Sequence, residues 1–228
     1  MAAIEPTSLD HVALWVADRD ALADLVCDHL GMHVIERTDR FTLVGADARE
    51  GKLTLFTADG PREPGALSAV VLRVPSLDEA LAGLPAGVAV AREDGMAWLE
   101  APEGLRLGLV SGAAAGTDLE HVRLRVSDVE ATAAALADLG FVREGSRLRV
   151  DDRWVELEDG GAPEGERPLL NHLAVLVDSA MAVAEEARRR GAEVADVVDA
   201  PNTLAVFLWG PDRVKLEFVE HKPSFSLV

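Results

Sequence analysis

The pattern that decides the fold is LNHLAVLV, residues 170–177. Leu173, Val175 and Val177 occupy alternate positions along it, as do the residues of one buried strand face, and His172 falls on the opposite face. Related stretches occupy 9–16, 67–74 and 119–126, and the third positions of the four stretches are 11, 69, 121 and 172. These positions lie 58, 52 and 51 residues apart. The chain therefore contains four copies of one unit of about fifty residues.

Each copy continues in the same way after this first strand. Seven residues past the third position comes a side chain that can cap a helix N-terminus: Asp18, Ser76, Asp128 and Ser179. A helix-like run follows, as in 130–139, and each run ends near a glycine suited to a left-handed cap: Gly31, Gly87, Gly140 and Gly191. Three extended pieces complete the copy, in the fourth one 192–198, 203–209 and 214–220. The predicted unit is βαβββ.

One such unit buries only half a core, so the units must pair. We expect an α+β fold of four modules in two consecutive pairs, whose mixed, curled sheets form a metal-binding cavity with the helices outside. The small-residue stretch 111–117 predicts a boundary between a structural pair, 1–111, and a pair that carries the metal and substrate site, 117–228. Within the pairs, 59–65 and 160–166 are the expected linkers.

Composition narrows the classes of partner. The net charge is -18, which argues against nucleic acids and anionic membranes, because both require clustered cations. The chain has one cysteine, Cys27, and no apolar run long enough to span a membrane. We expect a cytoplasmic protein that binds a small-molecule substrate, and we leave open whether it forms a homodimer.

The last strand carries an acidic residue that needs a partner. Val214, Leu216 and Phe218 share one face of 214–220, so Glu217 lies on the other face. A carboxylate withdrawn from water requires a cation, which Lys215 or Arg123 could supply without any metal. The third-position residues His121 and His172 are predicted to lie on the same face as Glu217. Two imidazoles and a carboxylate indicate a divalent metal with open positions, Fe(II) first, with Mn(II), Zn(II), Ni(II) and Co(II) as alternatives.

Other titratable residues are assigned by the same alignment of repeats. The first copy has His11, but Ala69 and Gly108 stand where the second copy would need a histidine and a glutamate, so the N-terminal half is predicted to be structural. Glu158 is a further candidate, as a fourth ligand or a catalytic group. His221 follows the alternation of Glu217 and is a candidate proton shuttle.

The fourfold unit, the third-position histidines and the closing stretch GPDRVKLEF, 210–218, resemble the vicinal oxygen chelate superfamily. That group includes glyoxalase I, extradiol catechol dioxygenases, methylmalonyl-CoA epimerase, and fosfomycin and bleomycin resistance proteins. The resemblance spans about 9–220. It is closest in layout to the four-module extradiol dioxygenases and implies that His121, His172 and Glu217 are the metal ligands.

Three functions follow from this resemblance. The first is an extradiol-type dioxygenase acting on a small vicinal diol. The second is a non-redox isomerase or lyase, similar to glyoxalase or the epimerase, in which Glu158 completes a set of two histidines and two glutamates. The third is a resistance-type protein that binds a small molecule without turnover. The chain contains no tyrosine, which the dioxygenases use near their substrate.

Overall fold

A computed structural model describes residues 4–113, 115–160 and 167–228. Its helices are α1 (Arg19–Asp24), continued by a π-helical turn (Leu25–His29), α2 (Leu77–Gly83), α3 (Val129–Asp138) and α4 (Ala180–Arg189), with 3₁₀ turns at Pro102–Gly104 and Pro211–Arg213. The strands are β1 (Ser8–Val16), β2 (His33–Arg37), β3 (Phe41–Gly45), β4 (Lys52–Thr57), β5 (Leu67–Val74), β6 (Ala91–Glu93), β7 (Met96–Glu100), β8 (Arg106–Ser111), β9 (Asp118–Val126), β10 (Val142–Glu144), β11 (Arg147–Val150), β12 (Arg153–Asp159), β13 (Leu170–Leu176), β14 (Val194–Asp199), β15 (Thr203–Trp209) and β16 (Lys215–His221). Among the described residues, no helix has both the length and the apolar character needed to cross a bilayer.

The four predicted βαβββ units are confirmed, including their local signals. Strands β1, β5, β9 and β13 coincide with the four repeated stretches, with ends that differ by one residue at most. The predicted caps also form, since Asp128 accepts a hydrogen bond from the amide of Ala131 at 2.9 Å. Gly140 follows the same helix with φ +95°, a conformation that side chains with a Cβ rarely adopt. Local sequence signals therefore account for the elements within each unit.

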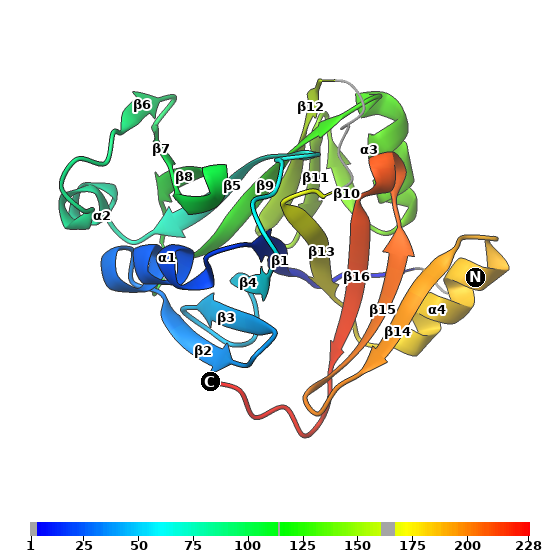
Figure 1. Cartoon of the computed structure of the whole chain (residues 1–228). Helices are drawn as coiled ribbons and strands as arrows, with labels where there is room; N and C mark the ends of the chain where they lie inside the picture. Colours follow the sequence, from blue (N-terminus) through cyan, green and yellow to red (C-terminus); the bar gives the residue numbers. More distant parts are fainter. Residues whose placement is uncertain (1–3, 114, 161–166) are drawn as a thin grey trace.

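The units pair differently from the sequence-based prediction. One eight-stranded sheet has the order β14-β15-β16-β13-β1-β4-β3-β2, and the other has the order β10-β11-β12-β9-β5-β8-β7-β6. We call them the outer-repeat sheet, built from the first and fourth units, and the inner-repeat sheet, built from the second and third (Figure 1). The prediction of consecutive pairs is therefore wrong. The antiparallel contacts β1–β13 and β5–β9 join the units instead.

The expected boundary at 111–117 does not separate the two sheets. It joins β8 to β9, and both strands belong to the inner-repeat sheet. Residue 114 of this stretch lies outside the described residues, as do residues 161–166 of the other expected linker, 160–166. The division into a structural half and a site-bearing half is thus replaced by two sheets that each draw on both halves of the chain.

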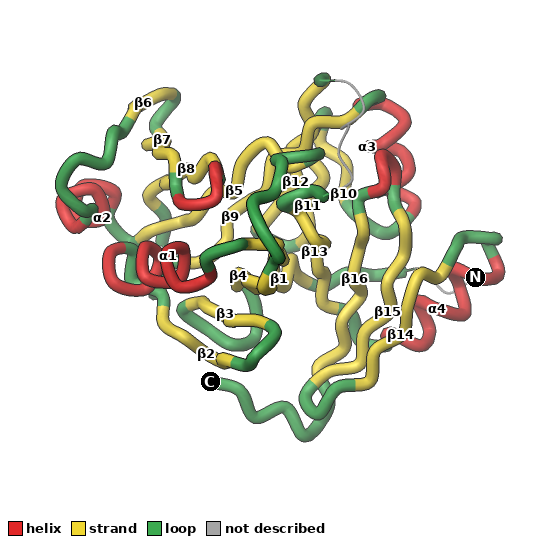
Figure 2. Tube along the Cα trace, in the orientation of Figure 1, coloured by secondary structure: helices red, strands yellow, loops and turns green. Residues whose placement is uncertain are grey.

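A common core lies between the sheets and beneath the helices, which occupy the periphery of the strands (Figure 2). In the outer-repeat sheet the core-facing side chains include Val12 and Leu14 of β1 and Leu216 and Phe218 of β16, all at most 1% exposed. Because strand residues alternate, the residues between them occupy the opposite, curved face of that sheet. That face is the one on which the sequence placed Glu217.

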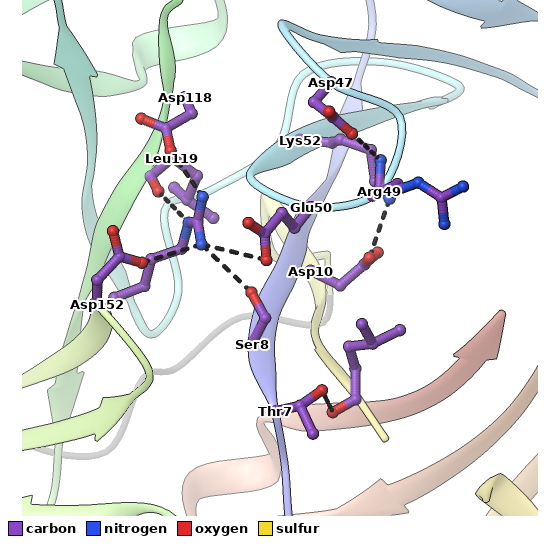
Figure 3. A network of polar contacts seen from close by, with 12 residues as sticks. Thr7, Ser8, Asp10, Asp47, Arg49, Glu50, Lys52, Asp118, Leu119 and Asp152 are labelled. Carbon is purple, nitrogen blue, oxygen red and sulfur yellow. Dashed lines mark hydrogen bonds and ion pairs between the residues drawn. The ribbon is translucent and has the colours of Figure 1, made fainter. Parts of the chain in front are cut away.

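A buried arginine ties the two sheets together. Figure 3 shows Ser8, Glu50 and Asp118 turned toward one guanidinium, which the polar contacts identify as Arg153 of β12. Its Nη2 donates to Asp118 at 2.7 Å and its Nη1 to Ser8 of β1 at 3.3 Å. The bidentate shape of a guanidinium suits such a multiple contact. Strand β1 of the outer-repeat sheet is thereby anchored to the inner-repeat sheet.

Candidate metal centre

Three side chains converge on the curved face of the outer-repeat sheet. They are His11 of β1, His172 of β13 and Glu217 of β16. The two Nε2 atoms are 3.1 Å apart, and Glu217 Oε2 lies 2.7 Å from His172 Nε2 and 3.3 Å from His11 Nε2. All three residues are at least nine-tenths buried. The cluster joins the first unit to the fourth.

Strand register explains why these three residues meet. Ala174 of β13 is opposite both His11 of β1 and Glu217 of β16. His11 and Glu217 therefore lie at the same level, on the strands to either side of Ala174. His172 lies two residues before Ala174 on β13 and points to the same face. The pairing of β1 with β13 thus brings the first unit next to the fourth and creates the cluster.

The hydrogen bonds of the imidazoles leave three acceptors facing one another. His11 Nδ1 lies 2.6 Å from Asp10 Oδ2, and His172 Nδ1 lies 3.1 Å from Asn171 Oδ1. Because these oxygens accept, each Nδ1 donates, and each neutral ring then has a lone pair on Nε2. Two ring lone pairs and a carboxylate oxygen repel one another unless a metal ion or a proton lies between them.

The spacing fits a divalent ion. Metal–ligand bonds of about 2.0–2.2 Å at right angles place neighbouring ligand atoms roughly 3 Å apart. The three observed separations are 2.7, 3.1 and 3.3 Å. Two imidazoles with one carboxylate on one side of an ion form the facial arrangement known for Fe(II), which leaves further positions open.

Protonation shows how the site balances its charge without an ion. Burial alone would lower the pKa of His11, but its contacts with Asp10 and Glu217 outweigh burial and raise the pKa to about 9. Burial would raise the pKa of Glu217, whereas the nearby charge of His172 and hydrogen bonds from both histidines lower it to about 2. Burial lowers the pKa of His172. One proton on His11 therefore offsets the carboxylate.

A second layer of charged residues holds His11 in place. Lys52 Nζ donates to Asp10 Oδ1 at 2.9 Å (Figure 3), and both side chains are at least 96% buried. His221 Nε2 lies 3.3 Å from the same Asp10 oxygen. Burial alone would raise the pKa of Asp10, but the charge of Lys52 and hydrogen bonds with His11 and His221 hold it well below its usual value. His221, a predicted proton shuttle, thus lies behind His11 rather than among the three converging side chains.

Aromatic side chains border the cluster on its other side. The ring centroid of His172 lies 5.2 Å from that of Phe207 and 6.1 Å from that of Phe56. Phe56 in turn contacts Trp15 at 5.4 Å and Phe41 at 5.6 Å. Such rings exclude water and strengthen electrostatic interactions nearby. The sequence placed Trp15 on a strand, but it gave no sign that these rings would gather.

The first unit supplies a histidine but no second carboxylate. Thr54 of β4 pairs with Ala13, two residues after His11, as Glu217 pairs with Ala174, two residues after His172. Thr54 therefore occupies the position equivalent to Glu217. The outer-repeat sheet offers three candidate ligands where a symmetric site would offer four.

His121 is not part of this cluster. It lies on β9 of the inner-repeat sheet, so the predicted set of His121, His172 and Glu217 does not assemble. The predicted shared cavity of the third and fourth copies is wrong for the same reason. His11, to which the sequence assigned a structural role, takes the place of His121. Register pairing puts Glu156, opposite Arg123, at the position equivalent to Glu217.

An arginine fills the corresponding place in the inner-repeat sheet. Arg123 Nε lies 3.3 Å from His121 Nε2 and 3.1 Å from Glu156 Oε2. Gly108 replaces the other carboxylate, and a Cβ added there would come within 2.8 Å of Trp98. This face is therefore closed by a guanidinium and an indole.

Glu158 also belongs to the inner-repeat sheet. It accepts a hydrogen bond from Ser68 at 2.6 Å and lies 3.6 Å from Arg123. It is not brought near His172 or Glu217, so the set of two histidines and two glutamates that included Glu158 does not form. The alignment of repeats matched Glu158 to Glu217. The strand register instead matches Glu217 to Glu156, two residues earlier.

Comparison with known proteins agrees with the architecture. Residues 8–98 match the family model described as Glyoxalase/Bleomycin resistance protein/Dioxygenase superfamily. A structure of a candidate dioxygenase from Bacillus subtilis subsp. subtilis str. 168 aligns with a TM-score of 0.76 at 17% identity, covering 98% of this chain and 88% of that one. Glyoxalase I from Zea mays aligns with a TM-score of 0.72 at 17% identity, covering 93% and 92%. No curated protein sequence matches.

Fold and site define an α+β protein of four paired βαβββ modules with a buried His/His/Glu cluster. The predicted resemblance to the vicinal oxygen chelate superfamily is confirmed: the fold is similar to that of the solved structures, and residues 8–98 match the model of the glyoxalase/bleomycin resistance/dioxygenase superfamily. That superfamily includes metal-dependent enzymes. The two solved structures are similar in fold, and neither identifies the reaction.

Proposed function

We propose that the chain is a metal-dependent enzyme that binds a divalent ion, Fe(II) by preference, through His11, His172 and Glu217. We further propose an extradiol-type dioxygenase reaction on a small vicinal diol. The observation that carries this proposal is the three-ligand cluster, in which Thr54 stands where a fourth strong ligand would be. Three ligands on one side of an ion leave room for two substrate oxygens and dioxygen.

The chain's own residues have distinct roles in this proposal. His11, His172 and Glu217 hold the ion, and Asp10 orients the His11 ring through Nδ1. A bound divalent ion would polarise the substrate oxygens and lower the pKa of a substrate hydroxyl. Phe56 and Phe207, beside His172, would exclude water from the bound diol. The interaction of aromatic rings with a planar substrate favours an aromatic diol.

Anaerobic loading with Fe(II), followed by an oxygen-uptake screen over catechols, tests the reaction. We expect uptake with at least one diol, and loss of uptake in His172→Ala. His121→Ala is the matched control, because it removes the equivalent histidine of the inner-repeat sheet and should leave uptake unchanged. Failure of every diol to consume oxygen, with the metal bound, would overturn the dioxygenase assignment.

A non-redox isomerase or lyase is the second proposal, supported by the whole-chain similarity in fold to glyoxalase I from Zea mays. It predicts activity in protein loaded with Ni(II), Co(II) or Zn(II), with exchange of a carbon-bound proton in the absence of oxygen. Deuterium incorporation into the substrate from heavy water, followed anaerobically, distinguishes the isomerase or lyase from the dioxygenase. Protein that is metal-free when purified and rejects added metal would instead indicate a binding protein.

A further inference from the structure

A lysine lies at the edge of the metal centre on the same face as Glu217. Lys215 is the first residue of β16, and it pairs with Trp209 of β15. Strand alternation places its side chain on the face that carries Glu217, two residues later. The Lys215 ammonium lies 5.0 Å from the centroid of the Trp209 ring and 6.0 Å from that of Phe207.

Phe207 connects this ammonium to the cluster. Its ring centroid lies 6.0 Å from Lys215 Nζ and 5.2 Å from the ring centroid of His172. Leu173 of β13 pairs with Leu216 of the parallel strand β16. One residue earlier on each strand, the same register leads to His172 and Lys215. One aromatic ring therefore lies between the cation and a proposed metal ligand. A molecule bound beside His172 and Phe207 would have Lys215 within reach of its far end.

Lys215 differs from the other lysines of this acidic chain. Lys52 pairs with Asp10 and Lys222 with Asp199. Across residues 4–113, 115–160 and 167–228, no carboxylate lies within ion-pair distance of Lys215, and its close contacts with other side chains include the two aromatic rings. Lys215 is thus a half-buried cation beside the site, in a protein of net charge -18. Because no carboxylate among the described residues pairs with its ammonium, its N–H donors are available to a ligand.

A second cation shares the same indole. The Arg213 guanidinium carbon lies 4.7 Å from the Trp209 ring centroid, and within the described part of the chain it too has no ion-pair partner. Arg213 belongs to the turn that immediately precedes β16. Two cations on one ring place two positive charges at this end of the site, which would attract and orient an anionic group.

We propose that the substrate is an aromatic vicinal diol that carries an anionic group such as a carboxylate, and that Lys215 binds this group. This inference rests on the proposed function, because it assumes that the diol end lies at His11, His172 and Glu217. The ring would lie beside Phe207 and the carboxylate would face the Lys215 ammonium. A charge-assisted contact of this kind is stronger than one between neutral groups.

Binding of two related diols to anaerobic Fe(II)-loaded protein tests the inference, with tryptophan fluorescence quenching and calorimetry as readouts. Catechol is the neutral probe, and protocatechuate adds a carboxylate to the same ring. We expect the wild-type protein to prefer protocatechuate by about ten-fold, and the preference to fall at high salt. Lys215→Met should remove the preference while changing catechol affinity by less than about two-fold. Lys215→Arg should retain most of it.

Arg106→Met is the matched control. Arg106 faces Trp98 at 4.3 Å in the inner-repeat sheet, where Gly108 is equivalent to Glu217, so it is the counterpart of Lys215 away from the cluster. It should keep the preference for protocatechuate. Circular dichroism and thermal unfolding of each variant would confirm that the fold is retained.

The outcomes separate this inference from the proposed reaction. A carboxylate preference that depends on Lys215, without oxygen uptake, would support the inference and overturn the dioxygenase. Equal affinity for both diols with oxygen uptake, or a preference that survives Lys215→Met, would overturn the inference alone. If neither diol binds, both are overturned.

Discussion

His11 and His172 lie 161 residues apart in the chain, yet their Nε2 atoms are 3.1 Å apart. The contact exists because β1 pairs with β13, which closes the first unit onto the fourth. Each histidine has its Nδ1 bonded to the preceding residue, Asp10 or Asn171. Sequence neighbours thus fix each ring, and the sheet fixes the distance between the rings.

The first prediction concerns which histidines bind the ion. His11→Ala and His172→Ala should each weaken metal affinity by at least about 100-fold, because each removes one of three converging donors. His121→Ala should retain the metal, since Arg123 already occupies the space between His121 and Glu156. Elemental analysis after dialysis against a weak chelator measures both effects. Retention by His11→Ala with loss in His121→Ala would contradict the site described above.

A second prediction concerns the buried pair behind His11. Asp10→Asn should lower metal affinity by roughly 10–100-fold, because the ring loses its charged acceptor. It should also destabilise the fold by about 3–5 kcal/mol, because Lys52 is left buried without its carboxylate. Titrations with urea and with metal measure the two quantities.

The double variant Asp10→Asn/Lys52→Met separates these two effects. It should recover much of the stability, since no charge remains unpaired, while metal affinity stays low. Asp199→Asn, which breaks the exposed pair with Lys222, is the control and should change stability by less than about 0.5 kcal/mol. If the double variant regained wild-type metal affinity, Asp10 would have no role in orienting His11.

Most of the fold could be predicted from the sequence because its signals are local. Alternation in the four repeated stretches, the caps such as Ser179 and the glycines such as Gly191 depend only on neighbouring residues, and all form as expected. The position of a candidate ligand within its unit was also local, so the sequence singled out His172 and Glu217. Both lie in the observed cluster.

The pairing of units could not be predicted, because all four first strands have similar alternation and edges. Pairing the third unit with the fourth would bring together His121, His172 and two glutamates, which suggested a complete site. The residues that argue against a site formed by the third and fourth units are Gly108, Trp98 and Arg123. The large side chains of Trp98 and Arg123 fill the inner-repeat face beside Gly108. That combination has meaning only once β5 is known to pair with β9.

A third prediction follows from the raised pKa of His11. In metal-free protein this pKa is about 9, compared with an ordinary value of 6.5. A proton held more tightly in the folded state stabilises the fold fully below pH 6.5, and the stabilisation is lost as the pH rises through about 9. The free energy of unfolding should fall on the order of 2 kcal/mol between about pH 7 and 10.

Two comparisons test whether the proton on His11 causes this fall in the free energy of unfolding. His11→Gln should flatten the decline, since its side chain cannot bind the proton. Metal-loaded protein should also show a smaller decline over the same interval, because the ion replaces the proton on the ring. Urea unfolding at several pH values measures each curve. An unchanged decline in His11→Gln would assign it to another group.

The last prediction uses Thr54, the residue at the position equivalent to Glu217. Thr54→Glu would add a second carboxylate on β4 beside Ala13, so we expect Zn(II) or Ni(II) affinity to rise by about ten-fold. Oxygen uptake by Fe(II)-loaded protein should fall, because the new side chain would occupy a position needed by substrate or dioxygen. Thr54→Val is the control of similar size and should leave metal affinity unchanged. Metal titration and the oxygen electrode distinguish the cases: unchanged affinity in Thr54→Glu would show that Thr54 does not face the ion.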